Sequence, residues 1–261
     1  MRLVVKIGTS TLAHPTGLLD IRHVELLVKV LSDLKNAGHE IVLVSSGAIG
    51  MGVGKLMLPG RPGDMPTKQA AAAVGQCELM YTYDRLFSKY NHTVGQVLLT
   101  GEDIHSDHRR RNIRNTINRL LELHALPIIN ENDAVVTDEI GVENTIGEND
   151  TLSAIVAKLI GAELLVLLSD IDGLYTADPR QDKAAKLIPV VSEITPEIEA
   201  LAGGRGSSLG TGGMATKLSA ARLICSAGGN MVIANGSHPE TLYDIVAGRE
   251  TGTRFLGRRQ K

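Results

Sequence analysis

Hydrophobic and polar residues alternate along this chain in blocks that predict strands and helices in turn. Short aliphatic runs such as 3–7 and 164–168 are typical of strands buried on both faces of a parallel sheet. Longer blocks such as 149–160, with apolar residues three or four positions apart, predict amphipathic helices. Strands are predicted at 3–7, 39–44, 93–99, 125–129, 164–168, 186–191, 231–234 and 253–256, and helices at 20–37, 69–90, 107–124, 149–160, 214–227 and briefly from 195. This alternation indicates an α/β fold, a three-layer sandwich of helices about a mostly parallel central sheet.

One block joins a helix to a strand and has polar residues at both ends. Asn149 and Asp150 lie at the start of the predicted helix, where short polar side chains cap free backbone N–H groups. Ser169 and Asp170 follow the predicted strand 164–168 at its carboxyl end. Because ligands of open α/β sheets bind outside the carboxyl ends of the strands, we expect both polar pairs to face one ligand crevice.

Polar residues also follow the other predicted strands. The segment 130–133, Asn-Glu-Asn-Asp, is costly to bury without a ligand or partner, which favours a functional role. Lys6 and Gly8 end the first strand and could approach a phosphate group, although an ordinary loop is the alternative. Ser46 lies in the glycine-rich segment 45–52, which predicts either a flexible turn or a close backbone approach to a small ligand. The glycine spacing there fits neither the dinucleotide nor the Walker A fingerprint.

A second glycine-rich segment, 203–217, runs directly into the predicted helix 214–227. Its glycines leave backbone N–H groups free to approach a ligand, and Lys217 adds a positive charge near the start of the helix. The helix dipole and the free N–H donors act together to favour an anion at such a position. The sequence therefore predicts a local anion site here.

The overall composition excludes several classes of partner. The 261 residues are 43% hydrophobic and 21% charged, which is ordinary for a globular protein. With 27 Lys and Arg against 29 Asp and Glu, the net charge of −2 gives no general attraction to nucleic acid or to an anionic membrane. No segment approaches the roughly 18 uncharged apolar residues of a membrane span, and the N-terminus does not resemble a signal peptide. We expect a cytoplasmic protein with neither nucleic acid nor membrane as a partner.

Three further features have ordinary structural interpretations beside functional ones. The basic cluster 109–114 is expected on a solvated or subunit-facing helix surface, because no aromatic residues are interleaved with it as in nucleic-acid sites. The segment 105–108, with two histidines around an aspartate, favours a helix start over a metal site, since no third ligand is near in sequence. Cys77 and Cys225 are expected to be buried free thiols, which favours a reducing compartment.

Six segments taken together resemble the amino acid kinase family. They are 6–10, 45–49, 129–135, 147–150, 169–179 and 211–217. The segments 129–135 (INENDAV) and 211–217 (TGGMATK) are the specific ones, whereas 6–10 and 172–179 alone would fit several family members. The resemblance covers essentially the whole chain and implies the family's α/β sandwich as a single domain over residues 1–261. Many similar chains add a C-terminal PUA domain, but this chain stops at Lys261 and no such domain is expected.

The resemblance implies a kinase that phosphorylates a carboxylate. The branch of the family that it indicates transfers the γ-phosphoryl group of ATP to the γ-carboxylate of L-glutamate, the first step of proline biosynthesis. No general base is needed, because that carboxylate is already ionised near pH 7. Mg²⁺ would arrive with ATP, held largely by phosphate oxygens and water. The family also implies feedback inhibition by proline and a homo-oligomer, either a dimer or a tetramer.

The resemblance also implies a role for individual residues. Lys6 and Lys217 match the lysines that flank the transferred phosphoryl group, and Asp150 matches the acidic residue that holds them in place. Substrate contacts are implied for Ser46, Gly47, Asp133 and Asn149. ATP contacts are implied for Lys6, Gly8, Ser169, Asp170, Thr211, Gly212, Gly213, Met214, Ala215, Thr216 and Lys217. The N-terminal part of the chain would thus bind mainly substrate, and the part from about residue 163 mainly nucleotide.

Two alternative functions are consistent with the same features. A kinase of this fold could phosphorylate N-acetylglutamate, aspartate, carbamate or UMP instead. Asp133 favours glutamate over its acetylated form, because a free α-ammonium needs a carboxylate partner and an acetylated amine does not. A non-catalytic nucleotide-binding or nucleic-acid-binding regulator is suggested only by the arginine cluster 109–111, and the presence of Lys6, Asp150 and Lys217 argues against it.

Overall fold

A computed structural model describes residues 1–14, 18–135, 149–202 and 213–257. Its centre is an eight-stranded sheet with the strand order β3-β4-β2-β1-β5-β7-β8-β6. The strands are β1 Arg2–Ile7, β2 Glu40–Ser45, β3 Val94–Leu99, β4 Leu126–Glu131, β5 Leu164–Ser169, β6 Val190–Val191, β7 Asn230–Asn235 and β8 Thr253–Phe255. All neighbouring strands are parallel except β7 and β8, which confirms the predicted mostly parallel sheet.

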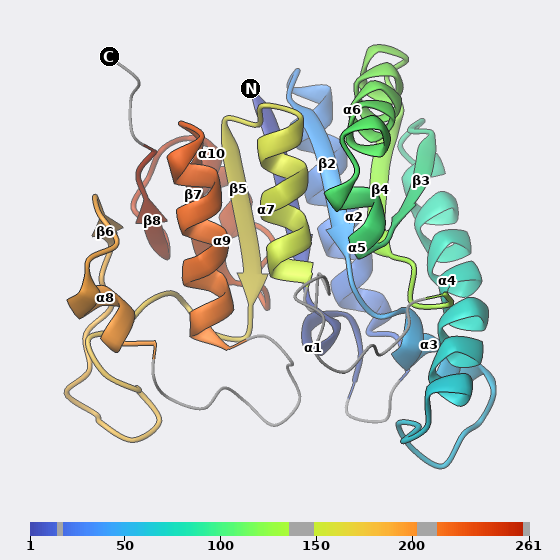
Figure 1. Cartoon of the computed structure of the whole chain (residues 1–261), viewed down its shortest axis with the longest axis horizontal. Helices are drawn as coiled ribbons and strands as arrows, with labels where there is room; N and C mark the ends of the chain where they lie inside the picture. The colour runs from blue at the N-terminus through green and yellow to red at the C-terminus, as the bar shows by residue number, and fades with distance from the viewer. Residues whose placement is uncertain (15–17, 136–148, 203–212, 258–261) are drawn as a thin grey trace.

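Helices cover both faces of this sheet (Figure 1). They are α1 Thr9–Leu12, α2 Ile21–Asn36, α3 Ala48–Lys55, α4 Met65–Ser88, α5 Gly101–His105, α6 Asp107–Glu122, α7 Asn149–Leu159, α8 Pro196–Ala200, α9 Met214–Ser226 and α10 Thr241–Val246. One hydrophobic core joins the sheet to α6, α7 and α9, and a second core joins it to α2, α4 and α10. Within β1, Val4 belongs to the first core and Val5 to the second, because successive side chains of a strand point to opposite faces.

Strand β1 lies in the centre of the sheet and brings distant parts of the sequence together. It pairs in parallel with β2 on one side and with β5 on the other. Ile7, its last residue, is in register with Ser45 of β2 and with Leu168 of β5. The carboxyl ends of these three strands therefore meet at one edge of the sheet, where open α/β sheets bind their ligands.

The glycine-rich segment 45–52 differs from the predicted turn, because α3 begins at Ala48. A Cβ atom on Gly52 would lie 1.8 Å from the carbonyl oxygen of Ala71 in α4. A Cβ atom on Gly75 of α4 would lie 1.8 Å from the carbonyl oxygen of Ala48 in α3. These glycines therefore allow two helix backbones to touch, and this tertiary contact outweighs the low helix propensity of glycine.

Other boundaries also differ from the sequence-based expectation. Helix α4 begins at Met65 rather than at residue 69, because the side chain of Asp64 accepts a hydrogen bond from the backbone N–H of Thr67. The strand predicted at 186–191 is confined to β6, Val190–Val191, because Lys186 and Ile188 donate their N–H groups to the segment 174–176 instead. Helices α1, α5 and α10 were not predicted from the sequence.

The remaining structural expectations have mixed outcomes. Both cysteines are free thiols; Cys225 is buried as predicted, but Cys77 is exposed on α4 and the prediction of its burial was wrong. Helix α6 begins at Asp107 as predicted, with Ser106 as its cap, and Arg109 and Arg110 form exposed ion pairs with Asp103 and Asp107.

In the described parts of the chain, no three His, Cys, Asp or Glu side chains lie together as metal ligands would. Over the same residues, no helix combines the length and the apolar character needed to span a membrane.

Candidate active site

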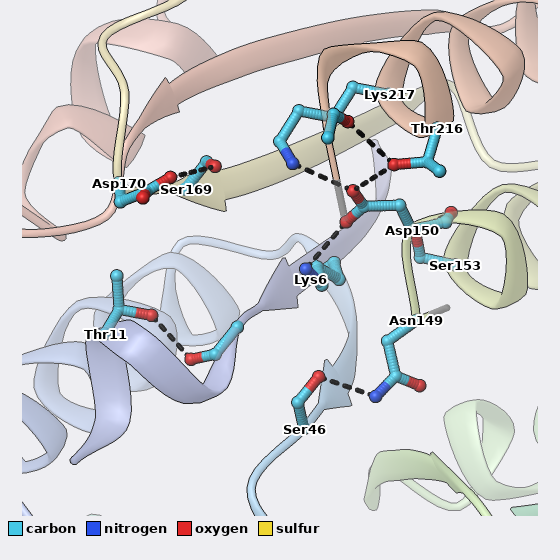
Figure 2. Close-up of polar contacts among 12 residues, drawn as sticks. Lys6, Thr11, Ser46, Asn149, Asp150, Ser153, Ser169, Asp170, Thr216 and Lys217 are labelled. Carbon is cyan, nitrogen blue, oxygen red and sulfur yellow. Dashed lines mark hydrogen bonds and ion pairs between the residues drawn. The ribbon is translucent and has the colours of Figure 1, made fainter. Parts of the chain in front are cut away.

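A single buried carboxylate, Asp150, lies between two lysines at the carboxyl edge of the sheet (Figure 2). Its Oδ1 is 2.6 Å from Nζ of Lys6, and its Oδ2 is 3.0 Å from Nζ of Lys217. Asp150 is only 1% exposed and Lys217 only 5%. The hydroxyl of Thr216 lies 3.4 Å from the same Oδ2. The three residues that the sequence predicted to be catalytic therefore form one cluster.

The electrostatics of this cluster favour a charged carboxylate. Burial by itself would raise the pKa of Asp150, but the charges and hydrogen bonds of Lys6 and Lys217 outweigh burial and hold its pKa below the ordinary value. Asp150 thus remains ionised at neutral pH and reduces the repulsion between the two ammonium groups. Two lysines and one aspartate leave one net positive charge, which suits an anionic ligand.

Three elements position the cluster. Lys6 is the penultimate residue of β1, Asp150 lies in the first turn of α7, and Lys217 lies in the first turn of α9. Gly8, the cap of α1, lies beside Lys6, and a Cβ atom on it would be in ordinary contact with Nζ of Lys6 at 3.5 Å. Helices α7 and α9 pack against each other on one face of the sheet (Figure 1). The N-termini of both helices therefore face the crevice, where their dipoles favour negative charge.

A second polar cluster lies beside the first, on the side of β2 and β4. Asn149 donates from Nδ2 to the hydroxyl of Ser46 at 2.6 Å and to Oδ1 of Asn130 at 3.2 Å. Figure 2 shows Asn149 pointing toward Ser46 and Asp150 pointing the other way, toward the lysines. Gly47 follows with a φ of +109°, a left-handed conformation that favours glycine, and caps α3. The structure therefore brings the predicted substrate residues Ser46, Gly47 and Asn149 together.

Asp133 lines a cavity of about 370 Å³ between α4, β3 and the segment after β4. Burial raises the pKa of Asp133, while the positive charge of Arg61 partly opposes this shift. Glu131 lines the same cavity, and burial together with the nearby Asp133 raises its pKa to about 7. Two carboxyl groups with raised pKa values make this cavity a place where a cationic group would be stabilised.

The predicted nucleotide residues lie at the carboxyl end of β5 and the start of α9. Ser169 donates to Asp170 at 3.2 Å, and Asp170 lies 3.6 Å from Arg180. Figure 2 shows this pair to the upper left of the Asp150 cluster and Ser46 below the cluster. Gly213 caps α9, and Met214, Ala215 and Thr216 form its first turn with Lys217. Thr211 and Gly212 lie outside the described residues.

Sequence reasoning gave no separate role to Asn130 or Gln76. Asn130 was part of a polar segment, and the structure shows it 1% exposed with a hydrogen bond to Gln76. Gln76 lies in an alanine-rich part of α4, and the available signal was an amide side chain among small apolar residues. The pairing of these two amides is a tertiary contact that helical or strand periodicity does not reveal.

This α/β sandwich, with a lysine pair held on one carboxylate at the carboxyl ends of parallel strands, has the architecture of a phosphoryl-transfer enzyme. The model of the amino acid kinase family matches residues 1–235, and the chain belongs to that family. Glutamate 5-kinase from Clostridium perfringens (strain 13 / Type A) is 51% identical over 99% of this chain and 96% of that protein. Glutamate 5-kinase from Clostridium tetani (strain Massachusetts / E88) is 54% identical over 97% of this chain and 93% of that protein.

Solved structures share the fold at much lower identity. Carbamate kinase from Giardia lamblia bound to AMP-PNP has a TM-score of 0.70 and 14% identity, with 98% of each chain covered. The isopentenyl phosphate kinase product complex from T. acidophilum has a TM-score of 0.66 and 18% identity, over 98% of this chain and all of that one. At these identities the likeness establishes the fold and leaves the acceptor to be argued from the site.

Proposed function

We propose that this chain transfers the γ-phosphoryl group of ATP to the γ-carboxylate of L-glutamate and so opens proline biosynthesis in the cytoplasm. The observation that carries this proposal is the buried carboxylate of Asp150 held between Lys6 and Lys217. The extensive similarity to glutamate 5-kinases supports glutamate as the acceptor.

Phosphoryl transfer requires mainly that the two reacting groups be positioned and that positive charge surround the moving group. In the proposal, Lys6 and Lys217 flank that group and neutralise the charge on its oxygens, while Asp150 fixes both ammonium groups before substrate arrives. No residue is needed to remove a proton, because the γ-carboxylate is already ionised near pH 7. Mg²⁺ belongs to the substrate here, since it enters bound to the phosphates of ATP.

The order of strands supports a division of the single domain, residues 1–261, into two binding sides. Strands β2, β4 and β3 lie on one side of β1, and β5, β7, β8 and β6 lie on the other. On the first side, Ser46, Gly47, Asp133 and Asn149 are proposed to bind glutamate. On the other side, from about residue 163, Ser169, Asp170 and the segment 211–217 are proposed to bind ATP together with Gly8 of the first loop.

The carboxyl groups of the cavity favour glutamate over acceptors that lack a positive charge. Asp133 and Glu131 both have raised pKa values, so an α-ammonium in their cavity would relieve the cost of their ionisation. N-acetylglutamate, carbamate and UMP have no such group. Aspartate has one, but its side chain is shorter by one methylene, so its carboxylate would not reach the lysines as well.

The test measures ATP consumption with Mg²⁺ against glutamate, aspartate, N-acetylglutamate, carbamate and UMP. Glutamate should give the highest kcat/KM. Lys217→Ala should lower kcat with glutamate by roughly 100-fold or more and leave the KM for glutamate nearly unchanged, because one preorganised charge at a developing transition state contributes about 3 kcal/mol. Preference for another acceptor, or a mutant within about threefold of wild type in kcat, would contradict the proposal.

The family resemblance supports two further proposals, a homo-oligomer (dimer or tetramer) and feedback inhibition by proline. Light scattering coupled to size exclusion measures the first. The second is measured as the change in apparent KM for glutamate when proline is added. A monomer at assay concentration, or an unchanged rate at high proline, would remove the corresponding proposal without affecting the proposed reaction.

A further inference from the structure

A chain of hydrogen-bonded amide groups, two of them buried and one partly buried, connects α4 to the proposed glutamate site. The Oε1 atom of Gln76 accepts a hydrogen bond from Nδ2 of Asn130 at 2.9 Å. The Oδ1 atom of Asn130 accepts from Nδ2 of Asn149 at 3.2 Å, and that Nδ2 also donates to the hydroxyl of Ser46 at 2.6 Å. This series of hydrogen bonds therefore runs from α4 through β4 and the start of α7 to the turn after β2.

One backbone group determines which partner donates and which accepts in each of these hydrogen bonds. The N–H of Glu131, which can only donate, bonds to Oδ1 of Asn130 at 2.9 Å. Asn130 must therefore present its oxygen on this side and its amino group to Gln76, which in turn must present Oε1. Because Oδ1 of Asn130 accepts, Asn149 must donate from its amino group. The carbonyl oxygen of Asn149 then points away from Asn130.

The series of hydrogen bonds ends at the carbonyl oxygen of Asn149. Its Oδ1 atom is buried and has no hydrogen-bond partner among the residues that the structure describes. Buried polar atoms are nearly always paired in native proteins, so this oxygen needs a donor from outside the described residues, and a ligand can provide one. In L-glutamate near neutral pH both carboxylates only accept, and the α-ammonium is the one group that donates. The open oxygen therefore suits the α-ammonium of the substrate.

We propose that Gln76 is a positioning residue for the substrate: it acts through Asn130 and holds the carbonyl oxygen of Asn149 toward the α-ammonium of glutamate. The inference rests on the proposed function and adds to it a residue that does not touch the substrate. Without the acceptor on Gln76, the amino group of Asn130 has no partner at this point, and rotation of both asparagine amides becomes easier. A rotated Asn149 presents its amino group to the ammonium, which is a repulsive arrangement.

The main test replaces Gln76 with methionine, which has a similar length but lacks the strong oxygen acceptor. Gln76→Met should raise the KM for glutamate roughly tenfold, with kcat and the KM for ATP within about twofold of wild type. Gln181→Met is the matched control, because Gln181 is exposed and lies outside both the amide chain and the cavity of Asp133. Its KM for glutamate should stay within about twofold of wild type.

A double-mutant cycle separates positioning from a general structural role. If Gln76 acts through Asn149, then Gln76→Met should change the KM for glutamate less than twofold once Asn149→Ala is present. Glutarate, which lacks the α-amino group, should lose little affinity in Gln76→Met. If Gln76→Met does not fold, Gln76→Asn, which withdraws the oxygen by one methylene, takes its place with the same expectations.

Additive effects of the two substitutions, equal losses for glutamate and glutarate, or an unchanged KM in Gln76→Met would each overturn the inference. These outcomes are distinct from failure of the proposed function. If the wild-type chain shows no glutamate-dependent consumption of ATP, the proposed function fails and the inference fails with it. If wild type is active and Gln76→Met is unaltered, only the inference fails.

Discussion

Glu131 and Asp133 place two carboxyl groups in one cavity, and both have pKa values above the ordinary range. Burial is the main cause for each, and the proximity of Asp133 adds to the shift of Glu131. Such an arrangement is unfavourable without a bound cation, since both charges are partly removed from water. It becomes favourable when an ammonium group binds. These two residues would therefore lower the stability of the free protein and strengthen the binding of a cationic group.

Asp133→Asn tests the proposed contact with the α-ammonium. The substitution should weaken glutamate binding roughly 10- to 100-fold, because a partly desolvated charge pair contributes about 1.5 to 3 kcal/mol. ATP binding should stay within about twofold. Glutarate should be a poor substrate of wild type and should lose little further in the mutant. Equal losses for both acids, measured as KM, or a mutant with a strongly lowered melting temperature would assign Asp133 to the scaffold instead.

Glu131 gives a pH-dependent effect on stability whose sign follows from its raised pKa. The folded state holds this proton up to about pH 7, whereas the unfolded state releases it near pH 4.5. The contribution of Glu131 to the free energy of unfolding is therefore most favourable below pH 4.5, falls as the pH rises from 4.5 to about 7, and is constant above.

Glu131→Gln should consequently stabilise the protein at pH 8 relative to pH 4.5. Because the carboxyl is only partly buried, we expect about 1 kcal/mol, or roughly 2–4 °C in Tm, rather than the full value of the shift. Thermal unfolding of both proteins at the two pH values measures the difference. An identical change in Tm at pH 4.5 and pH 8 would show that Glu131 is not the titrating group.

At the residue scale, the sequence predicted which side chains gather at the site but not how they are joined. Lys6, Asp150 and Lys217 could be predicted, because each lies at a strand end or a helix start that faces the ligand edge of the sheet. The direction of the amide of Asn149 could not, because it depends on the N–H of Glu131 through Asn130. Hydrogen-bond direction is a property of three-dimensional contacts between segments.

At the element scale, α3 and α4 pack closely because each helix has a glycine, with no side chain, at their contact. The Cβ positions of Gly52 and Gly75 are occupied by backbone atoms of the other helix. Because α3 follows directly from Ser46 and Gly47, the position of these two residues depends on this helix contact. The contact thus connects helix packing to the geometry of the proposed glutamate site.

Gly75→Ala should force the two helices apart. We expect a loss of about 1–3 kcal/mol in the free energy of unfolding, because the added methyl group meets backbone that cannot move aside easily. The KM for glutamate should rise as well, since Ser46 moves with α3. Gly63→Ala is the control, because nothing lies within 4 Å of the Cβ that it adds. Equal Tm values for the two variants would contradict the proposed packing constraint.

The same contact explains why the elements could be predicted only in part. Aliphatic runs and amphipathic blocks gave most strands and helices, because burial against the sheet dominates those segments. Helix α3 was not predicted, because its glycines are typical of a turn. They are helical here because α3 packs against α4. The strand expected at 186–191 was shortened, because its backbone N–H groups found partners in the segment 174–176. Both outcomes depend on segments distant in the sequence.

At the scale of the whole molecule, the strand order separates the two proposed binding sides about β1. Hydrogen exchange can test this division directly. Glutamate should slow exchange mainly in segments 43–55 and 126–135, and a non-hydrolysable ATP analogue mainly in segments 164–172 and 213–220. Protection from either ligand that is confined to the opposite side would contradict the assignment of substrate and nucleotide to the two sides of the sheet.

The central place of β1 also has a consequence for biosynthesis on the ribosome. The chain emerges from its N-terminus, so β1 and β2 are available early, but β5, which pairs with the other edge of β1, is complete only at Ser169. Until then one edge of an aliphatic strand has no partner, and such an edge readily pairs with other chains. Nascent or truncated chains that end before β5 should therefore aggregate and recruit chaperones, whereas chains that extend past β7 have covered both this edge of β1 and the outer edge of β5.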